Sequence, residues 1–264
     1  EDMDQAVGKV LETLEDTGID RDTLMIFTTD HGAGFPGAKA TLYDPGIHVP
    51  LIMHWPGHIE GGAAYEGLVS NMDVVPTLLE LADADVPPGL AGQSFLPLLK
   101  GQPCEERDAV CGTLLYDVAY DPMHYVRTRT HKYIRSFAIT PEDAEGADPD
   151  TLSTFAGGRW VRVDDFDVLA SPTWQALAPD GQAPRPEAEE LYDLRDDPCE
   201  RHNLVEDPDS RSLLEDMRRR MREMMERTES PLLQGHVQPP QRQREANVKH
   251  RPGLALFQQE VQRR

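Results

Sequence analysis

The sequence predicts an α/β protein: a largely parallel sheet flanked by helices, then a smaller subdomain with an antiparallel sheet and a long helix. Three observations support this. An amphipathic segment at 4–17 precedes an unbroken apolar run at 24–28, as in half of a βαβ unit. Short β-like runs follow residue 104. Residues 210–227 carry an apolar stripe at helical spacing.

The first helix is predicted over 4–17, and a polar turn separates it from the strand at 24–28. The apolar side chains of the helix share one face: Val7, Val10, Leu11 and Leu14. Gly18 follows where a left-handed C-cap is favoured. The strand lacks alternation, which indicates that both of its faces are covered, as in a parallel sheet.

The next elements are a strand within 49–54 and a helix from about residue 73 to 82. Pro76 is compatible with the first turn of this helix, where backbone N–H groups have no partner within the helix. Its apolar residues are expected to face the core: Val74, Val75, Leu78, Leu79 and Leu81.

The smaller subdomain is predicted to pair strands near 125–129 and 132–137. In the helix at 210–227, a stripe of methionines and leucines indicates a docking face rather than a cofactor site. The predicted division is therefore a catalytic α/β part at 1–103, a smaller α+β subdomain at 104–230 and an extended tail at 231–264.

The net charge of the chain disfavours two classes of partner. Asp and Glu number 47 against 26 Lys and Arg, a net charge of −21, which disfavours binding to nucleic acid or anionic lipid. No stretch approaches the roughly 18 apolar residues of a membrane helix. The first residue opens almost directly into a helix without a leader, so we expect a truncated chain.

The acidic excess also predicts a halophilic protein, because high salt screens the repulsion between like charges. We expect a higher melting temperature in molar KCl than in dilute buffer. Thermal unfolding followed by circular dichroism across a KCl series measures this. A midpoint that salt leaves unchanged or lowers would remove the high-salt interpretation.

Asp30 and His31 form the first candidate site, at the end of the predicted strand and before a glycine-rich turn. Ligands gather at such strand ends in open α/β sheets. A carboxylate beside an imidazole can bind a divalent metal, although two residues do not complete a site. The alternative is a structural turn with hydrogen-bonded side chains.

Lys39 is the second candidate, because the chain has only five lysines and this one follows the glycine-rich turn. The turn is not a P-loop, since Ala38 separates Gly37 from the lysine and no Ser or Thr follows. An ammonium group can instead neutralise a bound oxyanion. His48 could contact substrate, with a structural role at the strand edge as the alternative.

Four blocks of sequence, in order, resemble the sulfatase family. Residues 26–32 and 39–52 are similar to the segment that ends a core strand in a metal-binding Asp and then presents a lysine to the sulfate. Residues 73–79 resemble the family's D-x-x-P-T-L helix. Residues 89–99 resemble its G-x-S-x-x-P-L-L loop. The E-L-Y-D-L and D-P-x-E-x-x-N-L patterns within 190–204 resemble its near-C-terminal signature.

The resemblance implies an alkaline-phosphatase-like fold and specific roles. Asp30 and His31 would bind one divalent ion, with Ca²⁺ implied by the family and Mn²⁺ or Mg²⁺ as alternatives. Lys39 would contact the sulfate. Many sulfatases have Asn where this chain has His31, which leaves room for manganese. The substrate would be a sulfated small molecule or glycan, and the turn at 35–39 also resembles heparan N-sulfatase relatives.

The nucleophile implied by the resemblance is a formylglycine made from Cys or Ser in a C/S-x-P-x-R motif. None of Cys104, Cys111 and Cys199 lies in such a motif, and no serine does. We therefore expect a C-terminal sulfatase portion that is inactive alone. The alternatives are a phosphonate monoester or phosphodiester hydrolase on the same scaffold, and a catalytically silent fragment or binding module.

Overall fold

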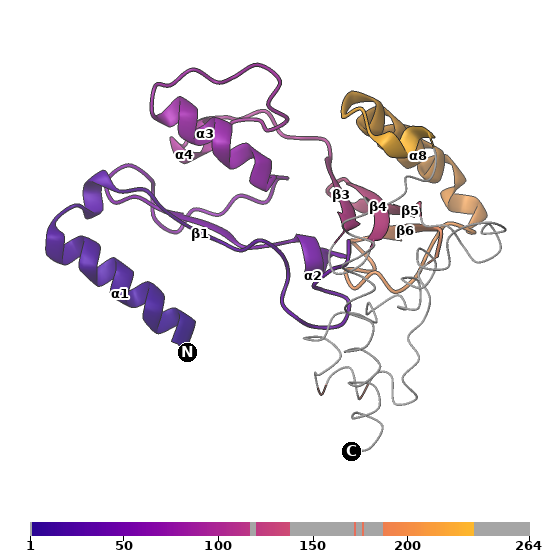
Figure 1. The fold of residues 1–264 in the computed structure, drawn as a ribbon, viewed down its shortest axis with the longest axis horizontal. Helices are drawn as coiled ribbons and strands as arrows, with labels where there is room; N and C mark the ends of the chain where they lie inside the picture. The colour runs from indigo at the N-terminus through magenta and orange to yellow at the C-terminus, as the bar shows by residue number, and fades with distance from the viewer. Residues whose placement is uncertain (1, 117–119, 138–171, 173–175, 177–186, 235–264) are drawn as a thin grey trace. The chain divides into compact units, whose positions relative to one another are not determined.

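The computed structural model describes residues 2–116, 120–137, 172, 176 and 187–234, as shown in Figure 1. The chain divides into two compact units. Unit 1 is Glu1–Asp30 with Pro50–Val110, and unit 2 is His31–Val49 with Cys111–Arg264. The short segment His31–Val49 thus leaves the first unit and belongs to the second. Within the described ranges, no helix combines the length and apolar composition needed to cross a membrane.

Helix α1 (Asp2–Thr17) opens unit 1 and confirms the predicted helix and its C-cap. Gly18 has φ of 69°, a left-handed conformation that costs glycine little. The backbone N–H of Gly18 donates to Glu15 O at 3.0 Å, and that of Ile19 donates to Leu14 O at 3.2 Å. These bonds satisfy carbonyls of the last helical turn, so the helix ends there. The 3-10 helix η1 (Asp20–Asp22) follows.

Strands β1 (Met25–Thr28) and β2 (Leu51–His54) form a two-stranded antiparallel sheet in register Met25↔His54 to Thr28↔Leu51. The prediction of a parallel sheet is therefore wrong for the described residues. A parallel pair needs a crossover connection that returns the chain to its starting edge, usually through a long helix. Here His31–Val49 joins the other unit and the chain comes back in the opposite direction. β1 is half-buried rather than covered on both faces.

The second helical part of unit 1 contains η2 (Asn71–Asp73), α3 (Val74–Leu81) and α4 (Leu96–Leu99). The helix predicted near residue 73 is confirmed, but its predicted core face is wrong at two positions. Val75 and Leu78 are 53% and 37% exposed, whereas Pro76 and Thr77 are buried. The reason is that Thr77 faces the loop before α4 and accepts a hydrogen bond from Phe95 N at 3.0 Å.

A four-stranded sheet forms the centre of unit 2, with strand order β3-β4-β5-β6. The strands are β3 (Val110–Tyr116), β4 (Tyr120–Arg127), β5 (His131–Ser136) and β6 (Glu189–Asp193). β5 pairs antiparallel with β4 and with β6, which confirms the predicted antiparallel sheet. Three consecutive side chains of β5 are buried, so both faces of this strand are covered: Lys132, Tyr133 and Ile134.

Helix α8 (Arg211–Arg227) packs against β4 and β5, after the 3-10 helix η4 (Pro208–Ser210). Figure 1 shows it next to the strands of this sheet. Its buried side chains are those of the predicted stripe: Leu214, Met217, Met221, Met224 and Met225. The methionine stripe is therefore a docking face, as predicted. The 3-10 helix η5 (Pro231–Gln234) follows, and the rest of the predicted tail lies outside the described residues.

Candidate active site

Asp30 and His31 lie on the two sides of the division between the units. Asp30 is two residues beyond the end of β1 and accepts a hydrogen bond at Oδ1 from Thr29 Oγ1, 3.2 Å away. His31 Nδ1 lies 2.8 Å from Gly32 O. A carbonyl can only accept, so this contact needs the proton on Nδ1, and in the neutral ring that leaves the lone pair of Nε2 for another partner. Both side chains are exposed.

This pair fits two positions of a divalent metal site. Hard divalent ions take roughly six to eight ligands, and carboxylate oxygens are preferred among them. In the part of the chain that the structure describes, no group of three or more His, Cys, Asp or Glu could hold a metal. That Asp30 and His31 bind a metal together with ligands from elsewhere stays a prediction.

The segment 31–49, called the lysine loop below, closes on itself through two glycines. Gly32 N donates to Gly46 O at 2.9 Å, which joins the start of the loop to the short helix α2 (Asp44–Ile47). A Cβ on Gly46 would lie 2.4 Å from Ala38 O, so any other residue there would push the two backbone segments apart. The loop is thus a compact structure with ends that lie close together.

Lys39 is half-buried in this loop, and the backbone on both sides of it is fixed. Its N–H donates to Ala33 O at 3.1 Å. Ala40 has φ of 60°, a conformation that non-glycine residues adopt rarely and that surrounding contacts must maintain. Thr41 Oγ1 donates to Ala38 O at 2.8 Å. These contacts limit the positions from which the lysine side chain can extend.

The structure brings His31, Lys39 and His48 into the same loop. His48 is exposed at the end of α2, where its N–H donates to Asp44 O at 2.7 Å. That Asp30, His31 and Lys39 face one pocket stays a prediction, since Asp30 belongs to unit 1 and the other two to unit 2.

Three charged residues of unit 2 outside the lysine loop contact Asp44 within it, and the sequence did not predict these four residues as a group. This buried charge centre consists of Asp44, Arg127, Lys132 and Glu200. Lys132 Nζ lies 2.5 Å from Asp44 Oδ1 and 2.7 Å from Glu200 Oε1. Arg127 donates to both carboxylate oxygens of Asp44, from Nε at 3.0 Å and from Nη2 at 2.9 Å. Two features of the sequence could have pointed to this group. Lysine is scarce in the chain, which makes Lys132 notable, and Glu200 is the glutamate of the D-P-x-E motif.

The two carboxylates of this centre have pKa values that move in opposite directions. Burial alone would raise the pKa of Asp44, but its contacts with Arg127 and Lys132 outweigh burial and lower that pKa to about 2. Burial raises the pKa of Glu200, and the neighbouring Asp44 carboxylate adds to this against the opposing effect of Lys132. The difference has a physical cause, since Asp44 has two cations while Glu200 shares one of them.

Aromatic contacts anchor the same loop beside the charge centre. Tyr43 and Tyr192 both donate to Glu190 Oε2, at 2.8 and 2.5 Å. Their rings meet edge to face with centroids 6.2 Å apart. Together with Leu42 and Ile134 they form a buried apolar cluster. Tyr43, four residues after Lys39, is therefore part of the core of unit 2.

The near-C-terminal signature is explained by these contacts and by Asn203. The side chain of Asn203 accepts from Leu191 N at 2.9 Å and donates to Glu189 O at 3.0 Å, so it pairs with the backbone of β6. Glu190, Tyr192 and Glu200 contact the lysine loop or its core. Residues of the signature thus hold the lysine loop against unit 2.

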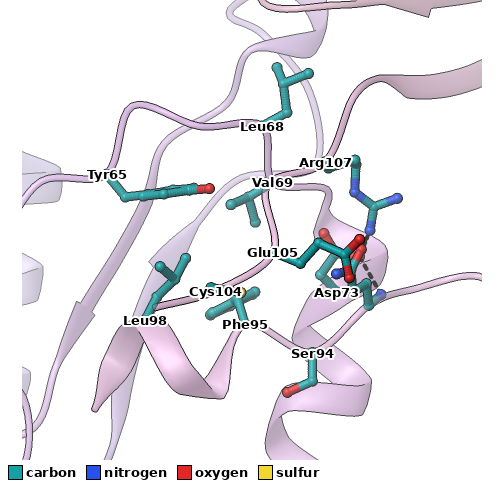
Figure 2. Close-up of a pocket in the computed structure, with 11 residues that line it drawn as sticks. Tyr65, Leu68, Val69, Asp73, Ser94, Phe95, Leu98, Cys104, Glu105 and Arg107 are labelled. Atoms are coloured by element: carbon teal, nitrogen blue, oxygen red, sulfur yellow. Dashed lines mark hydrogen bonds and ion pairs between the residues drawn. The ribbon is translucent and has the colours of Figure 1, made fainter. Parts of the chain in front are cut away.

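The pocket drawn in Figure 2 lies in unit 1 and is too small for a sugar substrate. Its volume of about 20 Å³ is roughly the space of one water molecule. Asp73 lies beside it, accepts from Gln93 N at 2.7 Å and pairs with Arg107 Nη2 at 2.5 Å. These contacts join the helix of the D-x-x-P-T-L block to the loop of the next block, which is a structural role.

Comparison with known proteins identifies the family. A model of the sulfatase family matches residues 1–84. The chain is 31% identical over 209 residues to an ulvan-active sulfatase of Formosa agariphila, with 76% of this chain and 37% of that protein covered. It is 31% identical over 255 residues to human N-sulphoglucosamine sulphohydrolase, with 87% and 46% covered.

A solved structure shows the same fold. A 2-O GAG sulfatase superposes with a TM-score of 0.64 at 24% identity, covering 91% of this chain and 44% of that one. The chain therefore spans less than half the length of each of these three proteins. The family match and the two relatives agree with the four sequence blocks, and the chain belongs to the sulfatase family, within the alkaline phosphatase superfamily.

Proposed function

We propose that this chain is the C-terminal portion of a sulfuric-ester hydrolase and supplies two metal ligands and a sulfate-binding lysine. The observation that carries the proposal is the lysine loop. It begins at His31, directly after Asp30, and fixes the backbone on both sides of Lys39. The coverage of less than half of each relative supports the view that other parts of the site lie outside these 264 residues.

The role of Lys39 is electrostatic. Hydrolysis of a sulfate ester breaks an S–O bond, and negative charge grows on the leaving oxygen and on the sulfate oxygens. A positioned ammonium stabilises that charge more in the transition state than in the bound ester. A divalent ion held by Asp30, His31 and further ligands would supply Lewis-acid polarisation, with Ca²⁺ first and Mn²⁺ or Mg²⁺ as alternatives. We assign His48, which belongs to the same loop, to substrate contact.

The nucleophile would be a formylglycine contributed by sequence outside this chain. No C/S-x-P-x-R motif occurs among the 264 residues, so a covalent mechanism needs another segment. The substrate class is a sulfated glycan or small molecule. This follows from the names of the relatives, which act on ulvan in one case and are named for N-sulphoglucosamine in the other.

One observation favours a second function on the same scaffold. His31 adds an imidazole beside the carboxylate of Asp30, and imidazole shifts preference from calcium toward transition metals. A phosphonate monoester or phosphodiester hydrolase would use such an ion. A catalytically silent binding module is the remaining alternative, and substrate assays separate the three.

Asp30→Ala tests the proposed metal site in the complete enzyme that carries this chain. We expect lower metal content and lower turnover, because the variant removes an anionic ligand from a site that depends on carboxylate charge. Elemental analysis measures the metal, and hydrolysis of an arylsulfate, a phosphonate monoester and a phosphodiester measures the activity. Asp85→Ala, an exposed carboxylate of unit 1, is the matched control.

The outcomes of this experiment distinguish the candidate functions. Preference for the arylsulfate supports the sulfatase, preference for a phosphorus ester supports the second function, and turnover of neither supports the binding module. Unchanged metal content in Asp30→Ala would contradict the proposed ligand. The 264-residue chain by itself is expected to hydrolyse none of the three, and turnover by it would contradict the need for an external nucleophile.

A further inference from the structure

We propose that Lys132, with Asp44, Glu200 and Arg127, is a positioning residue for Lys39. In this view the buried charge centre holds the lysine loop in the one arrangement that aims the Lys39 ammonium at the sulfate. The inference rests on the proposed function for its catalytic consequence. The contacts that carry it lie within unit 2.

Two of the three contacts of the Lys132 ammonium are with the lysine loop, and the third is with Glu200. It lies on β5 with a side chain that is 0% exposed, and its Nζ donates to Leu42 O at 3.1 Å. The same atom forms ion pairs with Asp44, in the loop, and with Glu200, outside it. The three oxygens around Nζ are thus one carbonyl that accepts a hydrogen bond and two carboxylate oxygens that pair with the ammonium charge. The lysine therefore connects the sheet to two positions of the loop.

Glu200 completes the connection from the other side. Its Oε2 accepts from the backbone N–H of Asp44 at 2.6 Å, while Oε1 faces Lys132. Glu200 has φ of 53°, so the chain adopts a rare conformation to place this side chain. With Arg127 forming a two-point contact to the Asp44 carboxylate, the backbone and the side chain of Asp44 are both held.

The energetics favour a role in positioning over a role in stability. Transferring charges out of water costs several kcal/mol per ion, and well-packed apolar residues are often as stable as a buried ion pair. Two cations and two carboxylates balance here, so the centre needs no external counter-ion. What such a centre adds is geometry, because a displaced loop would leave buried charges without partners.

The path from the centre to Lys39 is short. Leu42 is three residues after Lys39, and the residues between them are fixed by the left-handed Ala40 and by the bonds from Thr41 to Gly37 and Ala38. Movement at 42–44 therefore moves the backbone of Lys39. Misplacement of a catalytic group by about 1 Å can lower turnover on the order of 100-fold.

A double-mutant cycle in the complete enzyme tests the inference. The paired variant combines Lys132→Met with Glu200→Gln, so that two charges of opposite sign are removed together. It is made once with the wild-type Lys39 and once with Lys39→Ala. We expect kcat to fall about 10- to 100-fold in the first background and less than twofold in the second, because the centre acts through Lys39. Metal content should not change. Arg195→Met, which removes an exposed cation beside the same sheet, is the control that keeps full kcat.

Hydrogen exchange supplies a readout that does not depend on activity. The paired substitution should accelerate amide exchange over 32–46 and leave α8 protected, whereas a purely structural role would accelerate exchange throughout unit 2. An equal fall of kcat in both backgrounds, no fall, or unchanged exchange in the loop would overturn the proposal. If Lys39→Ala alone keeps full turnover, the proposed function fails instead, and the exchange data still decide whether Lys132 holds the loop. Should the paired variant not fold, Lys132→Arg, which keeps the charge, is measured by the same exchange and cycle.

Discussion

Replacing Lys39 with alanine is expected to lower arylsulfate turnover by the complete enzyme on the order of 10²- to 10³-fold, the usual effect of losing one electrostatic contact to a developing oxyanion. Metal content should stay unchanged, because Lys39 carries a positive charge and is no metal ligand. The loss should appear mainly in kcat, since the ammonium interacts most strongly with charge that grows in the transition state. Steady-state kinetics with elemental analysis measures both quantities.

The control for this variant is another lysine of the same chain. Lys100 is exposed in unit 1, and Lys100→Ala changes the net charge by the same amount. We expect kcat and KM to stay within about twofold of wild type for Lys100→Ala, as for surface substitutions generally. Full activity in Lys39→Ala would contradict the proposed role of Lys39. An equal loss in Lys100→Ala would show that net charge rather than this position matters.

Replacing Met217 with alanine is expected to destabilise unit 2 by about 2 to 5 kcal/mol, the range for deleting a large buried side chain and leaving a cavity. Met217 is 0% exposed, at the middle of the face that α8 packs against β4 and β5. Alanine keeps the helical propensity, so the loss reports packing alone. Urea unfolding followed by circular dichroism measures the change.

Arg222→Ala is the matched control on the same helix. Arg222 is exposed on α8, and its replacement should change the free energy of unfolding by less than about 0.5 kcal/mol. A loss below about 1 kcal/mol for Met217→Ala would contradict the docking role of the methionine stripe.

The apolar run of β1 shows where local pattern misleads. An unbroken apolar strand indicates cover on both faces, and the same run is compatible with parallel or antiparallel pairing. β1 pairs antiparallel with β2 and is half-buried, and apolar side chains of unit 1 are exposed, among them Val10, Ile52 and Val75. Pairing direction depends on the route of the connection, which no window of sequence contains.

The sequence by itself determined the helices within 4–17, 73–82 and 210–227, because the period of apolar residues and the caps are local properties. It also identified the order of the four family blocks and the chemical types of Asp30, His31 and Lys39. Only the tertiary structure showed that 31–49 belongs with the C-terminal sheet, and that Lys132 of that sheet is buried in contact with 31–49. The physical reason is distance along the chain: Lys132 contacts a carbonyl 90 positions away, and Glu200 an amide 156 positions away, so these partners meet only when the chain folds.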